Sequence, residues 1–231
     1  DSAIFTQAAI FMSAKCTRDA NFMSATFTQG ARFQFATFTQ DAWFVSAIFA
    51  QGAQCISAIF SGFAYFSRAR FKFGPCFIDS QFEKPTKFNF AAFGKSFPVL
   101  DGAVLHPNTS FTARESAEVG NDDRQSDTKE VRRLWPDKIV GSQEELEAAK
   151  DSCSIIRHAV GQQGRPEDEH FFFRKEMGFA AQIGGWWQRL PYRLFGWISY
   201  FGYSIARPSL ALGGTVRIPA GFYIVYHACQ N

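Results

Sequence analysis

The most constraining feature of the chain is the regular spacing of phenylalanine over residues 5–93. From Phe5 onward, one position recurs after six residues, then five, then six. It holds Phe5, Phe11, Cys16, Phe22, Phe27, Phe33, Phe38, Phe44, Phe49, Cys55, Phe60, Phe66, Phe71, Phe77, Phe82, Phe88 and Phe93. The residue two places earlier is small, mostly Ala. A period of 11 residues kept over this length indicates one short structural unit stacked many times.

The residues between the Phe positions favour strands over helices. An 11-residue period also suits a helical supercoil, but Thr, Ser, Gly and Asp fill positions where a helix needs strong helix formers. Alternate units carry an extra residue, at Asp19, Gly30, Asp41, Gly52, Gly74 and Pro85. Because Gly and Asp tolerate left-handed backbone and Pro favours turns, we expect these extra residues to make the corners.

These units resemble the Phe-centred pentapeptide repeats. The resemblance rests on residues 24–28, 36–40, 46–49 and 57–60 and extends over about residues 2–93. It implies a mainly β fold, a right-handed quadrilateral β-helix whose central Phe side chains point to the axis. The alternating spacing departs from a strict five-residue repeat and predicts 22 residues per coil. We expect the ladder Phe residues to form the core, with Cys16 and Cys55 as small buried hydrophobes.

Composition divides the chain into four segments. We predict the β-helix over residues 1–113, a polar linker over 114–141, a helical hairpin with an aromatic amphipathic helix over 142–207, and a membrane-contacting or docking tail over 208–231. Leu100, Leu105 and Phe111 fit a degenerate last coil after a two-residue slip. No cap is visible before the first coil, so we expect upstream residues or another subunit to cover it.

Two helices are predicted after the polar linker. Ser142 with Glu145 makes a capping box, and an apolar stripe follows it up to Val160. Pro166 begins the second helix, which has an acidic first turn. We expect these two helices to pair as a hairpin.

The chain becomes strongly aromatic from Trp186 onward, with arginines interspersed. The predicted docking residues are Trp186, Trp187, Arg189, Arg193, Trp197, Tyr200, Phe201 and Arg207. Trp and Tyr beside Arg fit a membrane interface, but also a helix packed on the end of the solenoid or on a partner. Residues 208–228 are long enough to span a bilayer, although Arg217 and Pro219 make a poor membrane helix.

Residues 169–176 and 201–208 weakly resemble segments of bacterial membrane-associated pentapeptide-repeat proteins. This second resemblance implies a membrane-associated protein whose ladder lies on the cytoplasmic side. A cytoplasmic location is the alternative.

The sequence contains no motif that predicts catalysis. None of its four His residues has a Cys or His partner at metal-ligand spacing, and no phosphate loop or nucleophile elbow occurs. We therefore predict a non-enzyme with no catalytic residue, cofactor or metal. The net charge of +3 disfavours mimicry of DNA as a topoisomerase-protection protein. Nucleic-acid binding is not expected either, since no exposed aromatics interleave with the basic patch of Arg68, Arg70 and Lys72.

These patterns together predict a non-catalytic scaffold for protein–protein contacts in a membrane-associated assembly. The expected partners are proteins, in a larger complex or by end-to-end self-association, and a membrane surface. The alternative function is the cytoplasmic domain of an integral transporter- or channel-like membrane protein.

Overall fold

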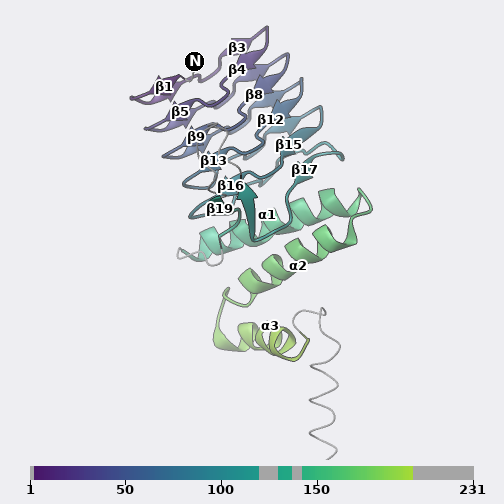
Figure 1. Ribbon diagram of the computed structural model, residues 1–231. Helices are drawn as coiled ribbons and strands as arrows, with labels where there is room; N and C mark the ends of the chain where they lie inside the picture. Colours follow the sequence, from purple (N-terminus) through teal and green to yellow (C-terminus); the bar gives the residue numbers. More distant parts are fainter. Residues whose placement is uncertain (1–2, 120–129, 137–141, 200–231) are drawn as a thin grey trace, which may run out of the picture. The chain divides into compact units, whose positions relative to one another are not determined.

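The computed structural model describes residues 3–119, 130–136 and 142–199 of the 231-residue chain. The chain divides into two compact units, Asp1–Glu176 and Met177–Asn231. The first unit is a parallel β-solenoid of about five turns, closed at one end by helices (Figure 1). The second unit contains the last residues of helix α2 and all of helix α3. The domain boundaries after residues 113, 141 and 207 stay predictions.

The solenoid has four faces, built from very short strands of successive turns. Face A holds β1 (Ile4–Phe5), β5 (Thr26–Phe27), β9 (Ile48–Phe49), β13 (Arg70–Phe71) and β16 (Ala92–Phe93). Face B holds β2 (Ala9–Ile10), β6 (Ala31–Arg32) and β10 (Ala53–Gln54). Face C holds β3 (Lys15–Cys16), β7 (Thr37–Phe38), β11 (Ile59–Phe60) and β14 (Gln81–Phe82). Face D holds β4 (Ala20–Asn21), β8 (Ala42–Trp43), β12 (Ala64–Tyr65), β15 (Thr86–Phe88) and β17 (Ser110–Phe111). The predicted four-sided solenoid is therefore confirmed.

The strand register confirms the predicted turn of 22 residues. On face A, Phe5 pairs with Phe27 and Phe27 pairs with Phe49, always in parallel. Backbone hydrogen bonds join each turn to the next, for example from the N–H of Thr26 to the carbonyl of Ala3 at 2.9 Å. Each turn thus supplies the hydrogen-bond partners of its neighbour.

The core consists of columns of phenylalanine rings beneath the faces. The rings of Phe5, Phe27 and Phe49 stack with centroids 4.8 Å apart. Rings of adjacent columns meet edge to face, as Phe38 and Phe44 do at 83°. Both arrangements are favoured by the ring quadrupole. Twelve ladder Phe residues are at most 2% exposed: Phe27, Phe33, Phe38, Phe44, Phe49, Phe60, Phe66, Phe71, Phe77, Phe82, Phe88 and Phe93. The predicted core is confirmed for these residues, while the first-turn members Phe5, Phe11 and Phe22 are only half-buried.

The extra residues lie at corners between strands, as predicted, for example Asp19 between β3 and β4, but their backbone is not left-handed. Positive φ angles of 52–60° occur instead at Ser13, Ser24, Phe35, Ser46, Ser57, Arg68, Asp79 and Phe90. All of these residues lie in the five-residue steps, where the chain must turn with one residue fewer. The extra residues serve other purposes. A Cβ at Gly74 would lie 1.9 Å from the carbonyl oxygen of Phe97, and Asp41 accepts a hydrogen bond from the N–H of Phe63 in the next turn.

The last turn departs from the 22-residue register by one residue. Phe88 pairs with Phe111, and Cys76 bridges to Val99, each 23 positions later. The predicted two-residue slip is therefore wrong, because a single additional residue lies between Phe93 and the buried Leu100. Phe111 still stacks on Phe88 at 4.9 Å.

A tryptophan from the predicted linker closes the end of the solenoid. Strands β18 (Ser116–Val119) and β19 (Glu130–Arg133) form an antiparallel hairpin, and Trp135 follows it. The Trp135 ring stacks on Phe93 at 4.7 Å, while its Nε1–H donates to the carbonyl of Thr112 at 2.8 Å. The N–H of Phe93 donates to the carbonyl of Leu134. Trp135 thereby adds one more aromatic ring to the column of face A.

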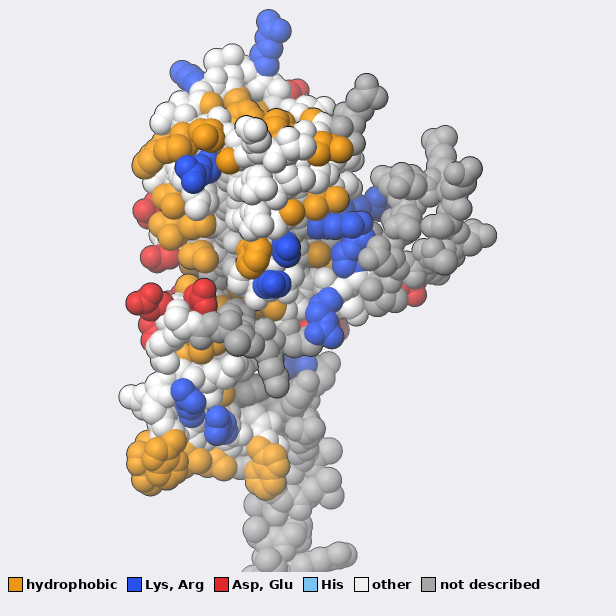
Figure 2. Space-filling model, turned by 90° about the vertical axis from the view of Figure 1, so that its left-hand side faces the viewer, with side chains coloured by type: hydrophobic (Ala, Val, Ile, Leu, Met, Phe, Trp, Pro, Cys, Tyr) orange, Lys and Arg blue, Asp and Glu red, His pale blue; other side chains and the backbone are white. Residues whose placement is uncertain are grey.

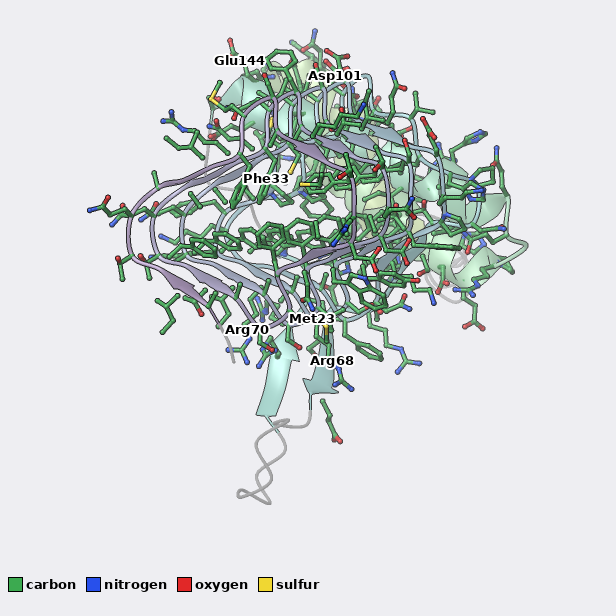
Figure 3. The ribbon with its side chains drawn as sticks, turned by 90° about the horizontal axis from the view of Figure 1, so that it is seen from above. Met23, Phe33, Arg68, Arg70, Asp101 and Glu144 are labelled. Carbon is green, nitrogen blue, oxygen red and sulfur yellow. The ribbon has the colours of Figure 1, made fainter. Side chains whose placement is uncertain are left out.

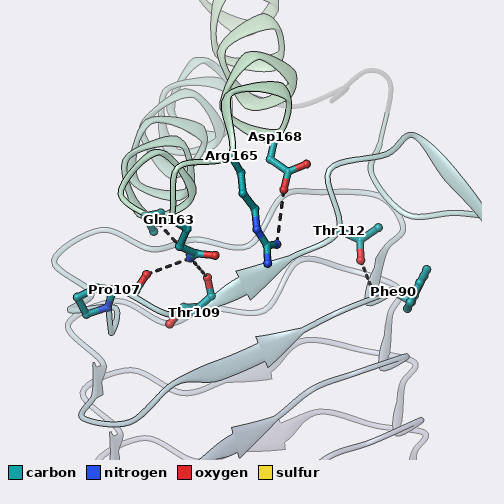
Figure 4. A network of polar contacts seen from close by, with 8 residues as sticks. Phe90, Pro107, Thr109, Thr112, Gln163, Arg165 and Asp168 are labelled. Atoms are coloured by element: carbon teal, nitrogen blue, oxygen red, sulfur yellow. Dashed lines mark hydrogen bonds and ion pairs between the residues drawn. The ribbon is translucent and has the colours of Figure 1, made fainter.

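Helices α1 (Gln143–Gly161) and α2 (Pro166–Ala180) cover the last turn. Ser142 and Glu145 form the predicted capping box. The buried side of α1 includes Ser152, whose hydroxyl accepts from the N–H of Leu100. Gln163 donates to the carbonyls of Pro107 and Thr109 (Figure 4).

The two helices are also joined to each other and to the closing aromatic ring. Arg157 of α1 pairs with Glu176 of α2 at 2.9 Å. Phe172 of α2, which is fully buried, meets Trp135 edge to face at 5.1 Å. The helices therefore belong to the same compact unit as the solenoid.

Phe49→Ala is expected to destabilise the solenoid strongly, because it removes a ring from the middle of a column. The expected loss is about 3–5 kcal/mol in the free energy of unfolding, measured by urea denaturation. Phe35→Ala is the matched control. Phe35 is 59% exposed, so its replacement is expected to change stability by about 0.5 kcal/mol or less. Equal losses would contradict the columnar core.

Trp135→Ala is expected to loosen the last turn while leaving earlier turns closed, because each turn contacts only its neighbours. Amide hydrogen exchange should accelerate at Phe93 and Leu134, and amides of face A near Thr26 should keep their protection. Uniform acceleration along the solenoid would contradict a local closing role.

Candidate functional site

Helix α3 (Trp186–Ser199) carries most of the predicted docking residues. Trp186, Trp187 and Trp197 are 62%, 67% and 75% exposed. Arg193 is exposed and Arg189 is half-buried. The other three predicted residues, Tyr200, Phe201 and Arg207, lie outside the described residues.

The helical period separates the side chains of α3 into an apolar side and a cationic side. The apolar side holds Trp186, Trp187, Leu190, Leu194, Phe195 and Trp197. Arg189 and Arg193 lie on the other side with Gln188 and Tyr192, and the helix contains no Asp or Glu. Large apolar side chains opposite a purely cationic face are typical of helices that lie in a membrane interface or bind a groove of a partner.

The first turn of the solenoid presents a second apolar surface. Its inward rings Phe5, Phe11 and Phe22 are half-buried, whereas their counterparts in later turns are covered on both sides. Ile4 and Ile10 point outward and are 65% and 62% exposed.

An outward aromatic pair on face D was not predicted. The rings of Trp43 and Tyr65 stack with centroids 4.1 Å apart, and Lys87 Nζ lies 5.6 Å from the centroid of the Tyr65 ring. Burial, with a smaller contribution from the Asp41 carboxylate, raises the pKa of Tyr65. The signal was present in the sequence, because residues exactly one turn apart share an outward column and these two are 22 positions apart.

A shallow groove lies between α1 and the solenoid. It has a volume of about 440 Å³. Its lining residues are Phe73, Gly74, Ser96, Phe97, Val99, Glu144, Glu145, Ala148 and Ala149. The lining is mainly apolar, and its polar side chains are Ser96, Glu144 and Glu145.

The described residues provide no constellation for metal binding. No group of three or more His, Cys, Asp or Glu side chains occurs within residues 3–119, 130–136 and 142–199. Burial raises the pKa of the Cys55 thiol, and it raises that of Cys153, where the Glu176 carboxylate adds to the effect. Such thiols are poor nucleophiles.

Cysteine labelling at neutral pH is expected to follow this burial. Cys16, on the half-buried first turn, should react with a soluble thiol reagent well before Cys55 and Cys153, because the latter are inaccessible and hold their protons more tightly. Mass spectrometry of labelled peptides measures the order, and denaturant should abolish the difference. Labelling of Cys55 as fast as Cys16 in the native protein would contradict the closed third turn.

Comparison with known proteins bears on the repeat segment. A family model described as pentapeptide repeats, in nine copies, matches residues 1–48. Searches of curated proteins and of solved structures found no match to the chain. The matched residues comprise the first two turns, and the same register continues through the turns that follow. Residues 1–48 are therefore similar to pentapeptide repeats, and the solenoid continues the same register beyond them.

Proposed function

We propose that the protein is a non-catalytic scaffold that holds protein partners at a membrane surface. The solenoid supplies the rigid part, and α3 supplies the docking part. The observation that carries this proposal is the combination of three exposed Trp side chains with two Arg and no acidic residue on one 14-residue helix. The cytoplasmic side of a membrane is the proposed location.

Rigidity of the solenoid supports the scaffold role. Each turn is hydrogen-bonded to the next and is filled by ring stacks, so outward side chains keep fixed spacings of about 4.8 Å along the axis. Pentapeptide-repeat solenoids commonly mediate protein–protein contacts. The candidate contact surface is the Trp43–Tyr65 pair on face D.

Interfacial chemistry supports a lipid partner for α3. Trp side chains favour the headgroup region, where the ring is buried and its N–H stays hydrated. Arg189 and Arg193 can reach phosphate groups from the opposite side of the helix. A protein groove that covers the apolar side of α3 is the competing occupant.

The second candidate function is the cytoplasmic domain of an integral membrane protein, and it requires a segment that spans the membrane. Among the described residues, no helix combines the length and the apolar character that crossing a bilayer requires. The segment proposed for that role, residues 208–231, lies outside the described residues. Peripheral docking through α3 is therefore the function we prefer.

Trp186→Ala with Trp197→Ala is expected to weaken binding to phospholipid vesicles by at least about tenfold, because two large apolar groups no longer enter the interface. Vesicle co-sedimentation measures the loss. Trp43→Ala with Tyr65→Ala is the matched control, since it removes two aromatic side chains from face D instead. Unchanged binding of the α3 variant would contradict membrane docking by this helix.

A further inference from the structure

The acidic side chains of the solenoid all lie away from face A. Within the described residues 3–113 they are Asp19, Asp41, Asp79, Glu83 and Asp101. Each one belongs to face C or to a corner next to it, as the flanking strands of faces B, C and D show. Face A is the face opposite face C. The segments that form face A and its two corners, residues 3–8, 23–30, 45–52, 67–74 and 89–96, contain no Asp or Glu.

Four cations gather on face A near its helix-capped end. This cationic band consists of Arg68, Arg70, Lys72 and Lys95. Lys72 and Lys95 approach one ring, with each Nζ 5.9 Å and 5.2 Å from the centroid of Phe73. Arg68 and Arg70 lie across the axis from Asp101 and Glu144, with Phe33 between the two pairs (Figure 3). The described carboxylates of the solenoid are therefore absent from face A, whereas its cations also occur elsewhere, as Lys15 on face C and Arg32 on face B show.

The rest of face A is uncharged and partly apolar. Its exposed apolar side chains include Ile4, Met23 and Phe90, which are 65%, 45% and 39% exposed. Figure 2, which views the left-hand side of Figure 1, shows hydrophobic and uncharged side chains beside Lys and Arg, with Asp and Glu gathered at its other edge. Five parallel strands in register make this face flat.

We propose that face A is a second membrane contact, which binds anionic phospholipid headgroups through the cationic band. This inference rests on the proposed membrane docking and names the lipid class and the solenoid face involved. Cations near an anionic surface lower the free energy of binding additively over a Debye length. The face A segments within residues 3–96 contribute no carboxylate, whereas Glu118 lies on the β18–β19 hairpin, whose strand β19 contacts β16. A single apolar anchor such as α3 binds a membrane weakly, and an additional electrostatic attraction, here from the cationic band, makes the binding stable.

Lipid fits face A better than nucleic acid does. Exposed Ile4, Met23 and Phe90 gain from burial in the interfacial region of a bilayer, but a phosphate backbone offers them no apolar partner. The described residues of face A also form a flat surface rather than the charged groove with stacking aromatics that binds single strands.

Two variants with the same change in net charge test the proposal in the full chain. The face A variant is Arg68→Gln, Lys72→Gln and Lys95→Gln. The control variant is Lys15→Gln, Arg18→Gln and Arg32→Gln, which changes exposed cations on faces B and C. Binding is measured by co-sedimentation with vesicles of phosphatidylcholine alone and of phosphatidylcholine with an equal amount of phosphatidylglycerol, at low and high salt. Circular dichroism verifies folding of all variants.

The wild-type chain is expected to bind the anionic vesicles at least about tenfold more tightly than the neutral ones at low salt. The face A variant should lose most of this preference and keep its binding to neutral vesicles, while the control variant should stay within about threefold of wild type.

Equal losses in both variants would overturn the proposal, because net charge rather than face A would then decide binding. Tighter binding to duplex DNA, dependent on the same three residues, would also overturn it in favour of nucleic acid. Equal binding of wild type to both vesicle types would overturn this inference and leave the proposed function standing. Binding to neither would overturn both.

Discussion

Stacking of aromatic rings along the solenoid axis is the interaction on which the rest of the structure depends. Over residues 5–93 the four inward positions of each turn deliver one side chain to each column, a Phe ring except at Cys16 and Cys55. The 4.8 Å separation of Phe27 and Phe49 is also the spacing of neighbouring strands. Ring contact and backbone hydrogen bonding are therefore satisfied by the same register. The residue two places before the ring is small, mostly Ala, and from the second turn onward most of these Ala are buried, because a larger side chain would compete with the rings for the interior.

The two ends of these columns are treated differently. At one end, Trp135 stacks on Phe93 and Phe172 meets Trp135 edge to face, so two helices complete the interior. At the other end, Phe5, Phe11 and Phe22 are half-buried and their strands present an edge. An apolar edge is a surface that gains free energy from any matching strand or apolar partner.

A rigid register also fixes what the outer surface can display. Because outward residues one turn apart lie in the same column, Trp43 comes to stack on Tyr65, and the described carboxylates of the solenoid lie around face C and not on face A. The same regularity that builds the core thus sorts charges and aromatics on the outside. The proposed membrane contacts use this sorting rather than any cleft.

The sequence by itself determined the turn of 22 residues, the four faces, the inward Phe columns and the capping box at Ser142, because each depends on local spacing that repeats or on neighbouring residues. It also identified the aromatic, cationic character of α3. Only the tertiary structure decided that the left-handed residues lie in the five-residue steps, as at Phe35. Before the turns stack, a left-handed residue could be placed in either the five-residue or the six-residue steps. Likewise Trp135 reaches the column of Phe93 across some forty residues of intervening chain. A contact of that range is selected by the shape and apolar character of the open column end, which exists only once the turns have formed.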